Sequence, residues 1–188
     1  MRIIAGFARG RKLLAPKIRG LRPTADRVKE SLFNMLGGIT KNTNVLDLYA
    51  GTGSLGIEAL SRGANSAIFV ECNRTVLDYL KKNLELTGFS SKSKTLEGKA
   101  EKVLKQLIKE GCLFNLIFID PPYKIDFSNL IEALKDSVLI SSPQGLIVLE
   151  HSKKIDAASI ESFLIDDITC VKTRKFGDTH VSIFKKYK

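Results

Sequence analysis

The chain has 188 residues, of which 44% are hydrophobic and 27% are charged, and its net charge at pH 7 is +10. This composition is that of an ordinary globular domain, which at this length buries roughly 70% of the surface of its unfolded chain. The longest apolar runs are much shorter than the ~20 residues of a membrane-spanning helix, and the first residues have no apolar signal-peptide core. We therefore expect a cytoplasmic protein with no membrane segment.

The cysteines and histidines are too scattered for a disulfide framework or a metal centre. Cys72, Cys112 and Cys170 form no C-x-x-C pair, and their number is odd. His151 and His180 are isolated in the sequence, so we expect structural roles for both. The sequence predicts no metal site.

Positive charge is concentrated at the N-terminus. Residues 1–22 contain no acidic residue and seven basic ones: Arg2, Arg9, Arg11, Lys12, Lys17, Arg19 and Arg22. Such a local excess is typical of a segment that binds a polyanion. Apolar residues are interspersed with these charges, which predicts an ordered arm anchored to a core: Ile3, Ile4, Phe7, Leu13 and Leu14. The runs 2–5 and 12–15, separated by glycines, predict a hairpin.

The rest of the chain follows an alternating pattern. A first helix is expected to open near Pro23 and end at Gly37-Gly38, with an apolar stripe formed by Val28, Leu32, Met35 and Leu36. Strands are then predicted at 45–48, 67–71, 94–96, 114–120 and 145–149, and helices at 54–62, 76–86, 101–110 and 128–139. A short helix at 159–164 precedes two strands, 168–172 and 181–185, that we expect to pair antiparallel. This order predicts an α/β fold with a mostly parallel sheet covered on both faces. We expect one globular domain over 23–188, preceded by a basic extension over 1–22.

A glycine-rich loop follows the first predicted strand and runs from Asp47 to Gly56. Its G-x-G-x-x-G spacing alone is compatible with a dinucleotide. A carboxylate four residues before the first glycine, however, suits a ligand ammonium better than a phosphate. Glu71 ends the second strand, where it can hold ribose hydroxyls. A ligand that carries an ammonium and a ribose and binds at a glycine-rich loop fits the description of S-adenosylmethionine. This activated methyl donor needs neither a metal nor a protein nucleophile. A dinucleotide-dependent oxidoreductase is the alternative, which an NAD titration would test.

The tetrapeptide Asp120-Pro121-Pro122-Tyr123 follows the most apolar predicted strand. Two prolines stiffen the backbone and leave carbonyl groups free to accept hydrogen bonds. The carboxylate and these carbonyls can accept both hydrogens of an exocyclic amine, while the tyrosine ring can stack on a base. Taken alone, the tetrapeptide is equally compatible with an ordinary acidic turn. Beside the glycine loop, it indicates a methyltransferase that modifies an amino group.

Over nearly its whole length, the sequence resembles the bacterial methyltransferases that modify a guanine N2 in 16S ribosomal RNA. The resemblance rests on the following blocks: Arg2-Ile3-Ile4-Ala5-Gly6, Arg9-Gly10-Arg11-Lys12-Leu13, Leu21-Arg22-Pro23-Thr24, Asp26-Arg27-Val28-Lys29-Glu30, Gly51-Thr52-Gly53, Gly56-Ile57-Glu58-Ala59-Leu60 and Asp120-Pro121-Pro122-Tyr123. It implies a Rossmann-like class I fold with seven strands, the last one antiparallel. It also implies a monomer that uses S-adenosylmethionine and acts on an assembled or partly assembled 30S subunit.

Three groups of site residues follow from the motifs and the resemblance together. The catalytic group is Asp120, Pro121, Pro122 and Tyr123. The cofactor group is Asp47, Tyr49, Ala50, Gly51, Thr52, Gly53, Gly56, Glu71, Cys72, Lys99, Ala100 and Asp120. The RNA-binding group is Arg2, Arg9, Arg11, Lys12, Arg22, Thr24 and Arg27.

Two departures from the family pattern limit this transfer. Lys99 stands where such enzymes often carry Asp or Asn, so Ala100 or nearby backbone is expected to recognise the adenine. Phe176 stands where a tyrosine is expected. Two alternatives stay open: an amino-methyltransferase of DNA adenine N6 or of a protein amide, and an RNA-binding ribosome-assembly factor.

Overall fold

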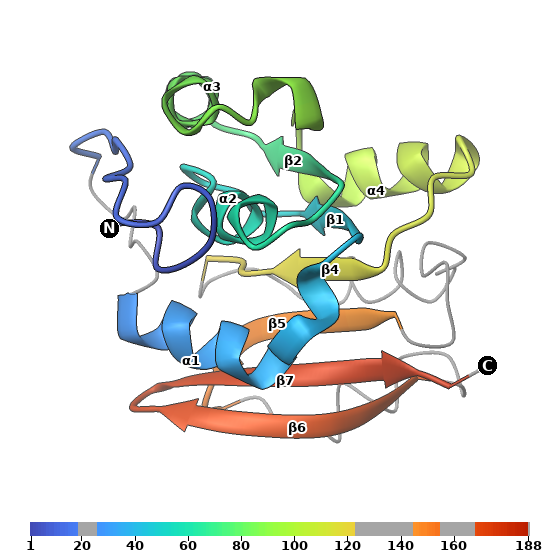
Figure 1. Ribbon diagram of the computed structural model, residues 1–188. Helices are drawn as coiled ribbons and strands as arrows, with labels where there is room; N and C mark the ends of the chain where they lie inside the picture. Colours follow the sequence, from blue (N-terminus) through green and yellow to red (C-terminus); the bar gives the residue numbers. More distant parts are fainter. Residues whose placement is uncertain (19–25, 123–144, 155–167, 188) are drawn as a thin grey trace.

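The computed structural model describes residues 1–18, 26–122, 145–154 and 168–187. Its centre is a seven-stranded sheet with the order β3-β2-β1-β4-β5-β7-β6 (Figure 1). The strands are β1 (Asn44–Asp47), β2 (Ser66–Glu71), β3 (Ser93–Glu97), β4 (Leu116–Ile119), β5 (Leu146–Ser152), β6 (Ile168–Phe176) and β7 (Thr179–Lys186). Strands β1 to β5 pair in parallel, whereas β7 runs antiparallel to both β5 and β6. The predicted fold class, including the antiparallel last strand, is confirmed.

The described helices lie close to their predicted positions. They are α1 (Asp26–Leu36), α2 (Ser54–Ser61), α3 (Arg74–Thr87) and α4 (Ala100–Lys109), with short 3-10 helices at Gly37–Thr40 and Ser90–Lys92. The helices predicted at 128–139 and 159–164 fall outside the described residues. Asn73 caps α3 by accepting a hydrogen bond from the Val76 backbone N–H at 3.1 Å, and Gly88 ends that helix in a left-handed conformation.

The buried face of α1 differs from the predicted apolar stripe. Leu32 and Leu36 are buried as expected, but Phe33 and Lys29 complete the buried face. Val28 and Met35 are only half-buried at its margin. The spacing i, i+3, i+4, i+7 from residue 29 defines one helix face, so a lysine lies at a core position.

The core has two layers, one on each face of the sheet. Alternation along β4 sends Leu116 and Phe118 into the cluster beneath α1, α2 and α3, and Ile117 and Ile119 into the cluster beneath α4. All four side chains are buried, as expected for a central parallel strand covered on both faces.

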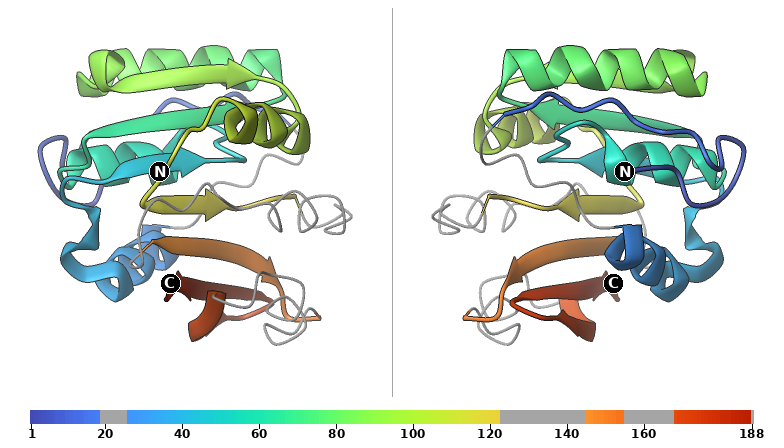
Figure 2. Two further views of the ribbon diagram at one scale, coloured as in Figure 1. Left: turned by 90° about the vertical axis from the view of Figure 1, so that its right-hand side faces the viewer. Right: turned by 90° about the vertical axis from the view of Figure 1, so that its left-hand side faces the viewer.

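The carboxyl ends of the parallel strands gather at one edge of the sheet. The arrows of β2 and β4 point toward this edge in Figure 1, and in Figure 2 (right) the arrow of β4 points to the left-hand side, where the same edge lies. Helix α2 begins at the same edge, directly after β1, and Lys29 in the first turn of α1 donates a hydrogen bond to Ser54, the first residue of α2. The N-terminal segment lies alongside α1 and α2. Open α/β sheets bind their ligands at this edge, so the fold places the candidate site there.

Candidate functional site

The three glycines of the loop between β1 and α2 have different functions. A Cβ added at Gly56 would lie 2.3 Å from the Phe69 ring, and one at Gly53 would lie 2.4 Å from Leu80 Cδ1. These two glycines therefore permit close packing of α2 and α3 against the sheet. Gly51 is left-handed, with φ +54°, and nothing lies within 4 Å of where its Cβ would be. Open space beside a left-handed glycine is what a ligand needs to approach the backbone.

Asp47 ends β1 and lies beneath this loop. Its side chain is buried, and its Oδ2 accepts a hydrogen bond from the Gly56 backbone N–H at 3.0 Å. Burial raises the pKa of Asp47 to about 7, although the Gly56 hydrogen bond opposes the rise. The negative charges of Asp120 and Glu71 also contribute to this rise in the pKa. Three carboxylates from the ends of neighbouring strands thus interact electrostatically, and such a cluster attracts a cation.

Glu71 connects the end of β2 to the glycine loop. Its Oε2 accepts a hydrogen bond from the Gly51 N–H at 3.0 Å, and its Oε1 accepts one from the Asn73 N–H at 2.7 Å. A carboxylate oxygen has two lone pairs, so each oxygen can still accept a ligand hydroxyl. Cys72, the next residue, is exposed, and its pKa is raised by partial desolvation and by the charge of Glu71.

The start of α4 forms the next part of this edge. The backbone N–H of Gly98 donates to the Glu71 carbonyl at 3.1 Å, which holds the 98–100 turn beside β2. Lys99 is exposed and Ala100 is buried. The Tyr49 hydroxyl donates to Glu101 Oε1 at 3.3 Å, and burial and that carboxylate raise its pKa. The predicted cofactor residues are thereby brought together along the ends of β1 and β2 and the start of α4.

Asp120, Pro121 and Pro122 follow the end of β4. Asp120 is half-buried, Pro121 is buried and Pro122 is exposed. The charge of Asp120 reaches Asp47, so the acidic end of this tetrapeptide belongs to the same carboxylate cluster. Tyr123 lies outside the described residues.

The N-terminal segment, residues 1–18, is docked against the domain. In place of a strand ladder, the predicted hairpin has one antiparallel bridge between Arg2 and Lys12. Ile3 and Leu13 are buried in the core, which agrees with the expected anchoring. The same expectation was wrong for Phe7, which is 90% exposed, and for Leu14, which is 43% exposed.

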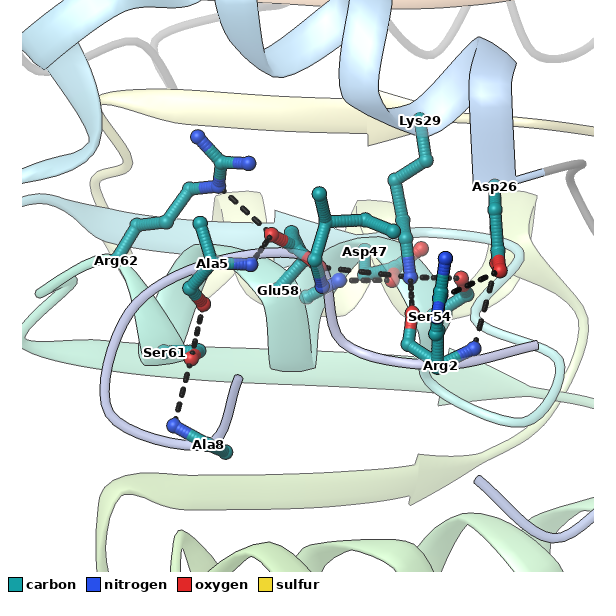
Figure 3. Close-up of polar contacts among 12 residues, drawn as sticks. Arg2, Ala5, Ala8, Asp26, Lys29, Asp47, Ser54, Glu58, Ser61 and Arg62 are labelled. Atoms are coloured by element: carbon teal, nitrogen blue, oxygen red, sulfur yellow. Dashed lines mark hydrogen bonds and ion pairs between the residues drawn. The ribbon is translucent and has the colours of Figure 1, made fainter. Parts of the chain in front are cut away.

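A buried glutamate on α2 holds the segment in place (Figure 3). Glu58 accepts hydrogen bonds from the backbone N–H groups of Ile4 at 2.8 Å and Ala5 at 3.0 Å. Its carboxylate also lies 2.8 Å from Arg62 Nε and 3.5 Å from Lys29 Nζ. Each of these partners donates to the negative charge, so the burial of Glu58 is compensated.

Lys29 connects three parts of the chain from within the core. Its ammonium donates to the Arg2 carbonyl at 2.7 Å and to Ser54 Oγ at 3.3 Å, beside Glu58 (Figure 3). Burial lowers its pKa, while the charges of Glu58 and Asp26 oppose the change. Lys29 therefore joins the segment to the first residue of α2, immediately after the glycine loop.

Asn83 on α3 makes a second such connection. Its Oδ1 accepts a hydrogen bond from the Leu14 N–H at 2.7 Å, and its Nδ2 donates to the Leu14 carbonyl at 2.9 Å. The same amide nitrogen donates to the carbonyl of Thr52 in the glycine loop at 2.9 Å. Lys29 and Glu58 belong to the sequence blocks that carry the family resemblance, but sequence analysis assigned no role to them or to Asn83.

The predicted RNA-binding side chains within the described residues are exposed. They are Arg2, Arg9, Arg11, Lys12 and Arg27. Arg2 contacts Asp26 through its Nε at 3.5 Å, while Arg22 and Thr24 lie outside the described residues. A second basic group, which sequence analysis also missed, lies on the edge strand β6 and consists of Lys172, Arg174 and Lys175.

Comparison with known proteins identifies the family. A family model described as conserved hypothetical protein 95 matches residues 1–185. Ribosomal RNA small subunit methyltransferase D of Haemophilus influenzae is 39% identical over 153 residues, which cover 81% of this chain and 79% of the relative. The chain belongs to the ribosomal RNA small subunit methyltransferase D family. The predicted resemblance to a family of small-subunit rRNA methyltransferases is confirmed.

Other members of the methyltransferase D family match as well. The Escherichia coli K12 protein of that name is 44% identical over 124 residues, 66% of this chain and 61% of its own. Bacillus subtilis YlbH, described as a candidate rRNA methyltransferase, is 36% identical over 186 residues, 99% of each chain.

Solved structures support the same fold. The structure of the Escherichia coli candidate methyltransferase yhhF matches with a TM-score of 0.83 and 33% identity, over 99% of this chain and 97% of its own. A hypothetical protein of Thermus thermophilus matches with a TM-score of 0.80 and 28% identity, over 97% and 98% of the two chains.

The described residues contain neither a group of three or more His, Cys, Asp or Glu side chains that could hold a metal ion nor a helix able to cross a membrane. His151 is buried, with its Nε2 2.9 Å from Ser182 Oγ and its Nδ1 3.1 Å from the Ser152 carbonyl. These contacts give it a structural role at the junction of β5 and β7.

Proposed function

We propose that this chain transfers a methyl group from S-adenosylmethionine to the exocyclic N2 of a guanine in 16S rRNA, within an assembled or partly assembled 30S subunit. The observation that carries the proposal is the cluster of three carboxylates, Asp47, Glu71 and Asp120, beside the open glycine loop. Relatives named ribosomal RNA small subunit methyltransferase D support the choice of RNA. The guanine N2 comes from the family resemblance.

The residues of the loop fit this methyl donor. The open space at Gly51 leaves room for a ligand against the backbone. The negative cluster suits a ligand that carries an ammonium and a sulfonium, and Glu71 can accept ribose hydroxyls. When bound, S-adenosylmethionine supplies a methyl group already activated by its sulfonium. A dinucleotide fits less well, because the same carboxylates would repel its phosphates.

Asp120 and Pro121 are the residues expected to orient the target base. The Asp120 carboxylate and the Pro121 carbonyl would accept the two N2 hydrogens and direct the nitrogen toward the methyl carbon. We expect Tyr123 to stack on the base once it has left its helix. The new C–N bond forms as the C–S bond breaks, and the proton leaves N2 for Asp120 or water. Positioning is then the main catalytic effect.

The test is transfer of a labelled methyl group to 16S rRNA, free and within the 30S subunit, followed by identification of the modified nucleoside. Asp120→Ala should lose about a hundredfold or more in rate. It should still bind S-adenosylmethionine in a calorimetric titration, although more weakly, because Asp120 contributes to the carboxylate cluster. Asp78→Ala, an exposed acidic residue on α3, is the matched control and should behave as wild type. Near-normal turnover by Asp120→Ala would exclude the assigned role, and tight RNA binding without transfer would favour an assembly factor.

A further inference from the structure

Phe7 is a large aromatic side chain exposed to solvent on a well-anchored loop. Its exposed fraction is 90%, the largest among the exposed large hydrophobic residues. Single exposed apolar residues are common, so exposure alone carries no function. Two features distinguish Phe7 from other exposed apolar residues. Its backbone is held by hydrogen bonds to α2, and basic residues follow it closely in the sequence.

Ser61, at the end of α2, fixes the backbone on both sides of Phe7. The Phe7 N–H donates to the Ser61 carbonyl at 2.8 Å, and the Ala8 N–H donates to Ser61 Oγ at 2.9 Å. The Ser61 hydroxyl donates to the Ala5 carbonyl at 2.6 Å. Gly6 has φ +83°, and a Cβ there would lie 1.7 Å from the Ser61 carbonyl oxygen. The loop is therefore held against α2, and the Phe7 side chain is presented outward from a fixed base.

The loop is also strongly basic. Arg9, Arg11 and Lys12 follow Phe7 within five positions and are exposed, and residues 1–18 contain no acidic side chain. Proteins that bind unpaired nucleotides combine basic side chains for the phosphates with aromatic rings on which bases stack. A preorganised aromatic ring among arginines matches that pattern.

We propose that Phe7 stacks on an unpaired base of the RNA substrate, away from the nucleotide that is methylated. This inference rests on the proposed function for the identity of the RNA. Ser61 lies at the opposite end of α2 from Ser54, and an eight-residue helix spans about 12 Å. The stacked base thus lies over the far end of α2, while the target base lies at the sheet edge by Asp120. Phe7 contributes to RNA affinity and leaves the chemical step unchanged.

The experiment compares Phe7→Ala, Phe7→Leu and Phe7→Trp in RNA binding and in methyl transfer. Loss of one base stack should weaken RNA binding about 5- to 150-fold in Phe7→Ala. Phe7→Leu, apolar without a π face, should lose most of the affinity, and Phe7→Trp should retain it. The rate at saturating RNA, the affinity for S-adenosylmethionine and the unfolding midpoint should stay at wild-type values. Leu113→Ala, at another exposed apolar position, is the control.

Salt dependence separates stacking from charge. Phe7→Ala should lower the affinity at every salt concentration without changing the slope of log Kd against log salt, whereas Arg9→Gln with Arg11→Gln should flatten that slope by about 1 to 2.

RNA affinity of Phe7→Ala equal to wild type would overturn the proposal, as would full affinity in Phe7→Leu or an equal loss in Phe7→Trp. If the wild-type chain transfers methyl groups to rRNA and Phe7→Ala binds normally, only the stacking proposal fails. If the wild-type chain transfers none, the proposed function fails, and the binding comparison still decides the role of Phe7.

Discussion

Replacing Glu58 by glutamine tests whether this buried carboxylate holds the N-terminal segment against the domain. Glutamine has nearly the same volume, so packing is preserved while the negative charge is removed. The amide oxygen of the glutamine can still accept a hydrogen bond from the backbone N–H of Ile4 or Ala5. Its NH2 group, however, is itself a donor and faces the other donors that the carboxylate had accepted from. Lys29, which is fully buried, then loses its carboxylate partner.

The expected effect is large on the scale of protein stability. Removing one partner of a buried ion pair destabilises a protein by about 3–5 kcal/mol, because the other charge stays buried without compensation. Total stabilities are about 5–15 kcal/mol. With a urea m-value of about 2 kcal/mol per M, the unfolding midpoint of Glu58→Gln should fall by roughly 2 M.

The assay is urea unfolding of Glu58→Gln, Lys29→Met and the double variant, with Glu85→Gln as an exposed control on α3. In the double variant no lysine charge is left in the core, so its loss should be smaller than the sum of the single losses. Limited proteolysis should cut residues 1–18 faster in Glu58→Gln. A loss below about 0.5 kcal/mol with unchanged proteolysis would refute the reasoning.

Three further predictions concern the loop beneath the site and the turn at Gly6. The pKa of Asp47 is raised from 3.8 to about 7 in the fold, so the native state binds more protons than the unfolded chain between these pH values. Wild-type stability should therefore lose up to about 4 kcal/mol more than that of Asp47→Asn as pH rises from 4 to 8; parallel pH profiles in urea unfolding would contradict this. Gly56→Ala places a methyl group against the Phe69 ring and should destabilise the protein by about 1–3 kcal/mol in the same assay, which an unchanged midpoint would disprove. In Gly6→Ala the added methyl group collides with the Ser61 carbonyl, so this variant should bind RNA more weakly while its melting temperature changes little; RNA affinity equal to wild type would show that the turn tolerates a side chain.

The central strands of the sheet could be predicted because they are short apolar runs bounded by turn residues. β4 is the clearest case: Leu116 to Ile119 is apolar throughout, as a strand covered on both faces must be. Asp47 and Asp120 could be predicted as site residues because a carboxylate at the end of such a run lies at the ligand-binding edge of a parallel sheet.

The buried polar network could not be predicted in the same way. Hydrophobic periodicity assigns charged residues to the surface, whereas Lys29 lies at a core position of α1 together with Phe33 and Leu36. Its spacing to these two residues was visible in the sequence. Its partner Glu58 lies on another helix, and no local pattern joins the two. The predicted burial of Phe7 was wrong for the opposite reason, because apolar character alone does not reveal which residues a turn directs outward.

The anchoring of the N-terminal segment has a consequence for how the chain acquires its structure. The contacts of Ile4, Ala5 and Ala8 join residues 53 or 54 positions apart, and those of Leu14 to Asn83 join residues 69 apart. At a synthesis rate of about 5–20 residues per second, roughly 3 to 14 seconds pass between the addition of Leu14 and the addition of Asn83. Pairings over such distances are also slow to close in the complete chain. Residues 1–14 are therefore synthesised well before the residues that hold them, and their basic side chains are available to a polyanion throughout that interval.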